Sequence, residues 1–442
     1  MRACIFALDI GCAVRYTRAD FMDFSRIGQQ LNVRTGINDL MEDMYEAIYS
    51  GRPNLCQLNG GAPAMLPELV RMWRASMERI MEQGEFESLV CSYQHPRGHE
   101  KFIQSLVKYL NDRYGWGITP ENVAVTQGGQ MAFFLLFNLL AGEGSPKSEI
   151  LFPLCPDYVG YQAQSLVGPS LFRGVKPRIQ RLGNHVFKYG IDFENLEIRP
   201  ETAAISLSRP ANPTGNVVTD EELDMLRAMA KAAGIPVMVD NAYGQPFPDI
   251  TSVPCNTVWD ENMVLSLSLS KIGLPGTRTG IIIARKEIID TVMNAVTVSA
   301  LCPNNLGQAL VEPYLADGSL DAVCRDVVKP YYRKRAAFAE SLLRQYFDDE
   351  LPWHVHKSEG AMFLWLWMDG LPIPVQELYE RCRERGCYVN PGHHFFFALP
   401  PEDRDWRHQH ECVRLSFTQP DDVLHRGIRI LAEEVARAYK EA

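Results

Sequence analysis

From about residue 122 to residue 285 the chain alternates short apolar runs, typical of β-strands, with longer amphipathic runs, typical of helices. The predicted strands are 123–126, 149–152, 203–207, 237–239, 263–267 and 280–284. The helical runs between them include 130–140 and 220–233, the second preceded by a cap-like Thr219 and followed by Gly234. This alternation predicts a mostly parallel α/β sheet with helices on both faces. Functional motifs are therefore expected directly after strands, where ligands of such sheets bind.

The pattern changes after about Pro313, and the C-terminal part predicts a second, smaller α+β lobe. It contains long helical runs at 320–347, 374–386 and 421–440, with strands expected at 361–368 and 413–417. A chain of 442 residues also exceeds the usual size of one domain. The expected division is an extension at 1–21, a segment at 22–65 that contributes to the small domain and to dimer contacts, a large domain at 66–315 and a small domain at 316–442.

Composition excludes several classes of protein. With 46% apolar and 22% charged residues the chain is an ordinary globular protein and not a disordered one. The formal charge of −10 provides no basic excess for nucleic acid or for an anionic membrane. Apolar stretches such as 131–141 are shorter than the roughly 20 residues that span a bilayer. Small molecules and further copies of the chain are the expected partners.

Cysteine usage and the N-terminus both bear on localisation. The 11 cysteines are scattered without a Cys-x-x-Cys pair, which indicates reduced thiols and a cytoplasmic protein. Arg2 followed by the apolar run 3–8 imitates a secretory signal, but Asp9 interrupts the run. Translation from Met22 is an alternative to translation from Met1.

Four polar segments follow predicted strands, and two of them present charged side chains. The segment 268–271, Ser-Leu-Ser-Lys, ends in Lys271, and Arg278 follows seven residues later. The strand at 237–239 leads into Asp240, with Tyr243 three residues further on. Taken singly, the first segment is also typical of a surface loop, and the second of a helix cap or a ribose-binding carboxylate.

The other two segments present an amide and a helix start. Asn212 lies between Pro210 and Pro213, whose rings favour a rigid turn that holds the amide in place. The glycines at 128 and 129 precede a predicted helix, where free backbone N–H groups favour an anion such as phosphate.

One ligand accounts for all four segments: pyridoxal 5′-phosphate. Its aldehyde requires a lysine, its ring nitrogen a carboxylate, and its phenolic oxygen hydrogen-bond donors. Its phosphate requires a helix N-terminus and a cation. The sequence therefore predicts this cofactor.

The order of these segments resembles the fold-type I, or aspartate aminotransferase, superfamily of pyridoxal-phosphate enzymes. More narrowly, the chain from about residue 22 onward is similar to the bacterial valine–pyruvate aminotransferases. The stretches that carry this similarity are 152–161, 208–218, 240–248, 266–283 and 359–367. The resemblance implies a large domain with a mostly parallel seven-stranded sheet, a smaller α+β domain, and a homodimer. It also implies amino-group exchange between L-valine and pyruvate, giving 3-methyl-2-oxobutanoate and L-alanine.

The resemblance implies roles for individual cofactor-binding residues. Lys271 would form the covalent link to the cofactor and then move the substrate proton. Asp240 would pair with the ring nitrogen, while Asn212 and Tyr243 would bind the phenolic oxygen. Lys271, Asp240 and Tyr243 are thus the predicted catalytic residues. The remaining cofactor contacts are a ring-stacking Tyr158 and the phosphate-binding Gly129, Gln130, Ser268 and Arg278, together with Tyr93 from the neighbouring subunit.

Substrate binding is assigned by the same resemblance to Arg414, Gly61 and Asn212. Arg414 lies in the apolar run 412–416, where a charged residue needs an anionic partner such as an amino-acid carboxylate. Asn59 and Ala62 depart from the family pattern beside this site. No metal is expected, because the histidine pairs 354/356, 393/394 and 408/410 lack further ligands at zinc spacing.

Two alternatives stay open at this point. The same scaffold could act on a different small amino acid in a specialised pathway, as an aminotransferase or as another pyridoxal-phosphate enzyme. A regulator with an aminotransferase-like domain is the second, although the segment before the cofactor domain is short and weakly basic for a helix-turn-helix.

Overall fold

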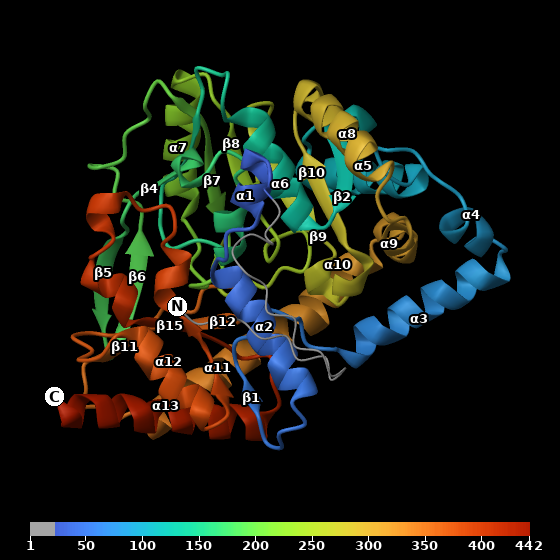
Figure 1. Ribbon diagram of the computed structural model, residues 1–442. Coiled ribbons are helices and arrows are strands. Elements are labelled where there is room, and N and C mark those ends of the chain that lie inside the picture. The colour runs from blue at the N-terminus through green and yellow to red at the C-terminus, as the bar shows by residue number, and fades with distance from the viewer. Residues whose placement is uncertain (1–22) are drawn as a thin grey trace.

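The computed structural model describes residues 23–442, so the predicted extension at 1–21 and the choice of start lie outside the described residues. Figure 1 shows two lobes, one around the green and yellow strands and a smaller one built mostly from the orange and red C-terminal part. Among the described residues, no helix has the length and apolar character that crossing a membrane requires.

The larger lobe contains a seven-stranded sheet in the order β2–β10–β9–β8–β7–β3–β4. Its strands are β2 (Val123–Gln127), β3 (Glu149–Phe152), β4 (Phe172–Gly174), β7 (Thr202–Ser208), β8 (Val237–Asp240), β9 (Met263–Ser268) and β10 (Thr279–Ile283). Only β10 runs antiparallel to its neighbours. The predicted mostly parallel seven-stranded sheet is confirmed, as are its six expected strands. The sequence missed only β4, which is three residues long and has no pattern of its own.

Helices cover both faces of this sheet, and β7 is accordingly buried along its whole length. The helices of this lobe are α3 (Pro67–Glu82), α4 (Phe86–Val90), α5 (Glu100–Tyr114), α6 (Gly129–Leu140), α7 (Asp220–Ala232), α8 (Lys286–Ala300) and α9 (Leu306–Ala316). The predicted start of α7 is confirmed by a capping box. The Glu222 amide donates to the Thr219 hydroxyl, and the Thr219 amide donates to the Glu222 carboxylate.

The smaller lobe contains a six-stranded sheet in the order β14–β15–β12–β11–β6–β5. Its strands are β5 (Arg178–Gly183), β6 (Val186–Gly190), β11 (Trp353–His356), β12 (Phe363–Met368), β14 (Asn390–Pro391) and β15 (Cys412–Ser416). The hairpin β5–β6 lies within the range expected for the large domain, yet β6 pairs with β11 of this sheet. The alternation of strands and helices indicates which residues are extended but not which sheet they join. The proposed domain boundaries stay a prediction.

Three helices pack against this second sheet or against one another: α11 (Lys329–Tyr346), α12 (Val375–Glu384) and α13 (Asp421–Glu441). The run 320–347 was predicted as one helix. It consists instead of α10 (Ser319–Val323), a π-helical turn (Cys324–Val328) and α11. Pro330 lies just after the π-helical turn, and because it lacks an N–H it cannot donate the usual backbone bond to the preceding turn.

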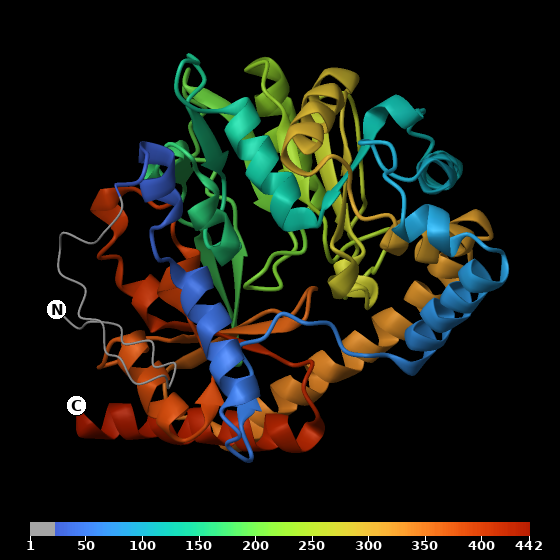
Figure 2. The same ribbon diagram turned by 45° about the vertical axis from the view of Figure 1, so that its right-hand side comes forward.

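The N-terminal segment connects the two lobes. It contains α1 (Arg26–Leu31), α2 (Gly36–Tyr49) and β1 (Cys56–Gln57), which pairs with β13 (Cys387–Tyr388) of the smaller lobe. Figures 1 and 2 show α2, in blue, lying across the junction of the two lobes. A Cβ at Gly36 would lie 2.6 Å from the His394 ring, so the start of α2 packs tightly against the smaller lobe.

Short 3₁₀ helices complete the chain, several of them beside the site described below. They are Pro120–Asn122, Val159–Gln164, Pro169–Leu171, Ser270–Ile272, Pro275–Thr277, Gly392–Phe395, Pro401–Asp403 and Arg407–Glu411.

Candidate active site

A cavity of about 310 Å³ lies where the two lobes and the N-terminal segment meet. The larger lobe supplies residues at the carboxyl ends of β7, β8 and β9 and at the start of α6, as predicted for a parallel sheet. The predicted site residues that line it are Gly61, Gly129, Gln130, Tyr158, Asn212, Asp240, Tyr243, Ser268, Lys271, Arg278 and Arg414. All four polar segments found in the sequence therefore meet in one place.

Lys271 presents its amine to the cavity from the 3₁₀ turn that follows β9. Its Nζ donates a hydrogen bond to the Gly61 carbonyl oxygen at 2.8 Å and lies 5.4 Å from the centre of the Tyr243 ring. Burial, together with the charges of Arg414 and Arg278, lowers the pKa of Lys271 to about 8, and Asp240 opposes this shift. At pH 7 about a tenth of the amine is then neutral, far more than for an ordinary lysine, which suits a nucleophile or a proton acceptor.

Asp240 ends β8 and faces the cavity with no basic side chain paired to it among residues 23–442. Its Oδ2 accepts a hydrogen bond from the Tyr161 phenol at 2.5 Å, and its Oδ1 accepts one from the Ala242 amide at 3.1 Å. Burial raises the pKa of the Asp240 carboxyl. A carboxylate in this position fits a protonated ring nitrogen.

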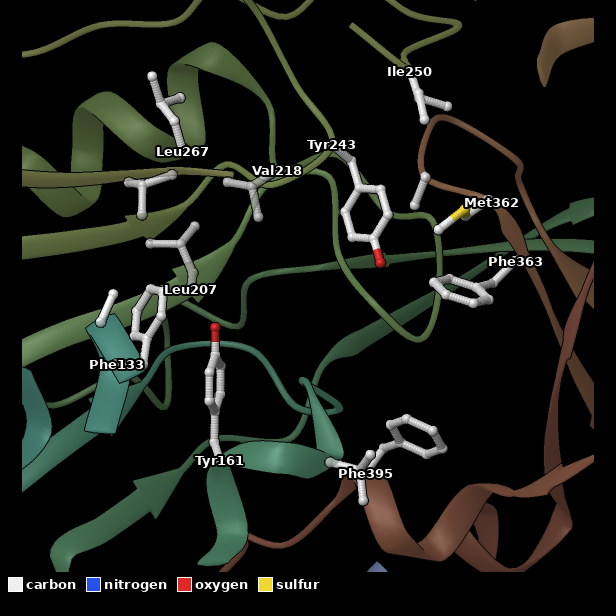
Figure 3. Packing of buried hydrophobic residues seen from close by; sticks show 14 of the residues in the cluster. Phe133, Tyr161, Leu207, Val218, Tyr243, Ile250, Leu267, Met362, Phe363 and Phe395 are labelled. Carbon is white, nitrogen blue, oxygen red and sulfur yellow. The ribbon is translucent and has the colours of Figure 1, made fainter. Parts of the chain in front are cut away.

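Tyr161 was not predicted as a site residue. It lies on the 3₁₀ helix Val159–Gln164, and its ring packs against Phe133 at 4.9 Å between ring centres. Figure 3 shows its phenol oxygen directed toward the strand that carries Leu207. The available signal was its spacing of three residues from Tyr158, which places both tyrosines on one turn.

An anion cradle lies at the N-terminus of α6, a helix of twelve residues. Gly128 has φ +85°, and a Cβ there would overlap the Arg278 guanidinium. A Cβ at Gly280 would lie 2.5 Å from the Gly128 carbonyl carbon. These glycines let the guanidinium and the strand approach the free N–H groups at the helix start, an arrangement that favours a phosphate. Ser268 also lines the cavity.

Arg414 enters the cavity from β15 in the smaller lobe and is only 2% exposed. Its Nη1 donates to the Asn212 side-chain oxygen at 2.8 Å, and its Nη2 donates to the Asn59 carbonyl oxygen at 2.7 Å. Its guanidinium carbon lies 4.3 Å from the centre of the Phe363 ring. Burial lowers the pKa of Arg414 to about 10.

No described acidic side chain pairs with Arg414, and its Nε has no hydrogen-bond partner among the residues of the structure. A buried cation that contacts only neutral groups and aromatic rings favours an anionic ligand. A carboxylate suits the planar guanidinium because it can accept two parallel hydrogen bonds.

Of the three predicted tyrosines, Tyr158 and Tyr243 line the cavity and Tyr93 does not. Tyr158 packs over Gly160, where a Cβ would overlap its ring, and Tyr243 is 5% exposed beside Phe363. Burial raises the pKa of both phenols, so both are neutral donors at physiological pH. Tyr93, by contrast, is 82% exposed and lies outside the cavity of this chain. Its expected role stays a prediction that concerns a second subunit.

Sequence reasoning also missed the apolar wall of the cavity. Four side chains of α2 form this wall: Ile37, Leu40, Met41 and Met44. The sequence shows α2 as an amphipathic segment, but nothing in it indicates that this helix covers a cavity formed by residues far along the chain.

Comparison with known proteins gives a consistent result. The family model for aminotransferase class I and II matches residues 61–431. Valine–pyruvate aminotransferase of Escherichia coli K12 is 41% identical over 424 residues, which cover 95% of this chain and 100% of that protein.

Two solved structures share the fold. The crystal structure of valine–pyruvate aminotransferase from Salmonella typhimurium LT2 has a TM-score of 0.84 and 39% identity, covering 92% of this chain and 100% of the other. The multiple substrate aminotransferase of Thermococcus profundus has a TM-score of 0.76 at 22% identity, covering 95% and 98%. The second likeness concerns the fold alone.

Proposed function

The chain belongs to the class I and II aminotransferase family, whose members use pyridoxal 5′-phosphate, and from this membership we propose that it exchanges amino groups between L-valine and pyruvate. The products are 3-methyl-2-oxobutanoate and L-alanine. The observation that carries the proposal is the meeting of a buried amine, an unpaired carboxylate, an anion cradle and a buried guanidinium in one cavity.

The residues of the cavity fit pyridoxal phosphate. Asp240 is placed to pair with the ring nitrogen, and Lys271 to bind the aldehyde carbon. The phosphate is assigned to the cradle described above, and the ring faces to the tyrosine-lined walls. When bound, this cofactor withdraws electrons from the α-carbon of the amino acid. Further contacts are assigned to Tyr158, Asn212, Tyr243, Ser268, Gly129, Gln130 and Arg278.

Proton transfer at the α-carbon is assigned to Lys271. Its pKa of about 8 leaves the amine able to accept a proton and to return it near neutral pH. The Gly61 carbonyl, which accepts the Lys271 hydrogen bond at 2.8 Å, orients the amine toward the cavity. Substituting Lys271 by alanine removes the group that moves the proton, so turnover is expected to cease.

The amino-acid carboxylate is assigned to Arg414, Asn212 and the backbone at Gly61. The side chain of the substrate then faces the apolar residues of α2, which supports an aliphatic amino acid. An apolar wall discriminates weakly, by about 1–3 kcal/mol per methylene or two. Other small aliphatic amino acids, such as 2-aminobutyrate, are therefore expected to be substrates as well.

A homodimer is part of the proposal. Large apolar side chains stand exposed on the larger lobe, among them Val298 at 90% and Tyr93 at 82%. Burying such side chains favours association, and Tyr93 is proposed to reach the phosphate in the partner subunit. Sedimentation equilibrium that gave only the mass of one chain would contradict this part.

The test of the function is the absorbance of the purified protein with bound cofactor. Adding L-valine is expected to remove the visible band of the lysine-linked cofactor, and pyruvate is expected to restore it. Lys271→Ala serves as the control, since it cannot form that link. If another small amino acid removes the band and valine does not, the substrate is wrong while the cofactor assignment stands. If no band forms with the unmodified protein, the cofactor assignment itself is wrong.

A further inference from the structure

A second buried carboxyl group, Asp157, lies behind Asp240 and takes no part in the proposed reaction. It follows β3 in the loop before the 3₁₀ helix Val159–Gln164 and is 2% exposed. Its Oδ1 accepts hydrogen bonds from the Ser208 hydroxyl at 2.5 Å and from the Tyr158 amide at 2.6 Å. Its Oδ2 accepts one from the Ser208 amide at 3.2 Å.

Ser208 and Tyr161 connect this carboxyl group to Asp240. Ser208 ends β7, and Asp240 is its register partner on the parallel strand β8. The Tyr161 phenol donates to Asp240 Oδ2 at 2.5 Å, and the neighbouring Ser208 hydroxyl acts to lower the pKa of that phenol. Two carboxyl groups, each hydrogen-bonded to a hydroxyl group, and these two neighbouring hydroxyl groups thus lie in one row of side chains.

No lysine or arginine among residues 23–442 forms an ion pair with either carboxyl group. Two neighbouring buried carboxylates disfavour each other's charge, which favours one proton on the pair, and the charge of Lys271 favours the ionised form of Asp240. Burial raises the pKa of Asp157 to about 7, and the charge of Asp240 adds to the shift. The titratable and charged groups that face this row are Cys155, Tyr158, Tyr243, Lys271, Arg278 and Arg414.

We propose that Asp157, Ser208, Tyr161 and Asp240 form one proton-sharing unit in which Asp157 holds the proton and Asp240 carries the negative charge. In this state the Asp157 hydroxyl donates to Ser208 Oγ, the Ser208 hydroxyl donates to the Tyr161 oxygen, and the Tyr161 hydroxyl donates to Asp240. When Asp157 is ionised, it lacks this proton and the hydrogen bond between Asp157 and Ser208 runs in the opposite direction. The positions of the side chains are the same in both states. Asp157 is then a positioning residue for Asp240.

The direction of this chain has a physical consequence for the cavity. A hydroxyl that accepts a hydrogen bond becomes a stronger donor, so protonated Asp157 strengthens the bond from Tyr161 to Asp240. When Asp157 is ionised, the Ser208 hydroxyl donates to Asp157 instead. The Tyr161 oxygen then accepts no hydrogen bond from Ser208, and its own bond to Asp240 is weaker. The protonated unit therefore keeps Asp240 ionised and fixed in orientation. Its relevance to the cofactor rests on the proposed function, while the unit itself exists in the cofactor-free protein.

The first test uses cofactor-free protein and infrared difference spectra of carboxyl groups between about pH 6 and pH 8. One buried carboxyl group is expected to titrate near neutral pH in the unmodified protein and to be missing in Asp157→Asn. The Tyr161 side chain hydrogen-bonds to Asp240 and not to Asp157. Tyr161→Phe is nevertheless expected to shift the titration of Asp157, because it removes the hydroxyl group between Ser208 and Asp240. Ser206→Ala is the matched control, because Ser206 lies on the same strand with a buried hydroxyl that has no partner among the described residues.

The second test measures the dissociation constant of pyridoxal phosphate. The side-chain amide introduced by Asp157→Asn can donate to Ser208 but no longer accepts from the Tyr158 amide at that position, so this variant is expected to weaken binding by only about threefold. Asp157→Ala breaks the chain and is expected to weaken binding about tenfold. If the alanine variant does not fold, the infrared titrations of the Asp157→Asn and Tyr161→Phe variants still test the proposal.

The proposal is overturned if no carboxyl group titrates near neutral pH, or if Tyr161→Phe leaves that titration unchanged. Equal weakening of cofactor binding by Asp157→Asn and Asp157→Ala overturns the positioning role. Failure of the proposed function would look different: the infrared titration would persist, while pyridoxal phosphate would not bind to the unmodified protein at all.

Discussion

Replacing Lys271 by methionine is expected to stabilise the cofactor-free protein at neutral pH, although it removes the central functional group. Methionine has a similar length and carries no charge, so the substitution removes a buried ammonium group while largely filling its space. Lys271 has its pKa lowered to about 8, from an ordinary value of 10.5, chiefly by burial. The folded protein therefore disfavours the charged form that predominates at pH 7.

The magnitude follows from that difference in pKa. Lowering the pKa from 10.5 to about 8 corresponds to about 3 kcal/mol, at roughly 1.36 kcal/mol per pKa unit, lost from the free energy of unfolding while Lys271 is charged. The variant also loses the hydrogen bond to the Gly61 carbonyl, which costs about 1 kcal/mol. The net expectation is a gain of about 2 kcal/mol at pH 7.

The sign of the pH dependence follows from the lowered pKa of a basic group. Below about pH 8 the folded protein carries the full penalty of the charge, and the penalty disappears as the pH rises from 8 to about 10.5. The free energy of unfolding of the unmodified protein therefore rises with pH over this range. The advantage of the methionine variant is expected to shrink in parallel.

Urea unfolding of the cofactor-free proteins, followed by tryptophan fluorescence at several pH values, measures this difference. Lys231→Met is the matched control, since Lys231 is exposed at the end of α7, away from the cavity. A difference between Lys271→Met and the unmodified protein that does not change with pH would refute the reasoning. A variant less stable than the unmodified protein at pH 7 would refute it as well.

Three further predictions concern the cavity. Gly128→Ala is expected to weaken pyridoxal phosphate binding at least about tenfold, because the new Cβ overlaps Arg278. Gly144→Ala, at a similar positive φ in open space, is the control, and equal affinities of the two variants would contradict the anion cradle. Arg414→Lys is expected to raise KM for valine about 10- to 100-fold without changing cofactor affinity, since lysine cannot offer two parallel donors; an unchanged KM argues against carboxylate binding there. Leu40→Ala is expected to reduce the preference for valine over 2-aminobutyrate several-fold, measured as a ratio of kcat/KM, and an unchanged ratio excludes a role of α2 in selectivity.

The sequence predicted the sheet of the larger lobe well because each of its strands is buried on both faces. Such strands are short, continuous apolar runs that end at polar residues, and they can be recognised without any tertiary information. The hairpin β5–β6 could not be assigned in this way. Its partner strand, β11, lies more than 160 residues further along the chain, and local pattern does not encode such a pairing.

The same distinction holds within the candidate site. Lys271, Asp240 and the glycines at the start of α6 each lie at or just after the end of a strand in a recognisable motif, so their chemistry could be predicted. Tyr161 lies three residues after the predicted site residue Tyr158. Its hydrogen bond to Asp240 could not be predicted, because the two residues are 79 positions apart in the sequence. Asp157 gave no signal as a partner of Ser208 for the same reason.

The sequence by itself determined the alternation of strands and helices, and with it the edge of the sheet at which the polar motifs gather. It did so because parallel strands bring their carboxyl ends to one side, whatever the rest of the chain does. Only the tertiary structure decided which distant residues complete the site. Arg414 reaches Asn212 across 202 residues, Lys271 reaches Gly61 across 210, and α2 closes the apolar side. These contacts depend on how the two lobes and the N-terminal segment pack, and that packing is set by the shapes of whole surfaces rather than by any local periodicity.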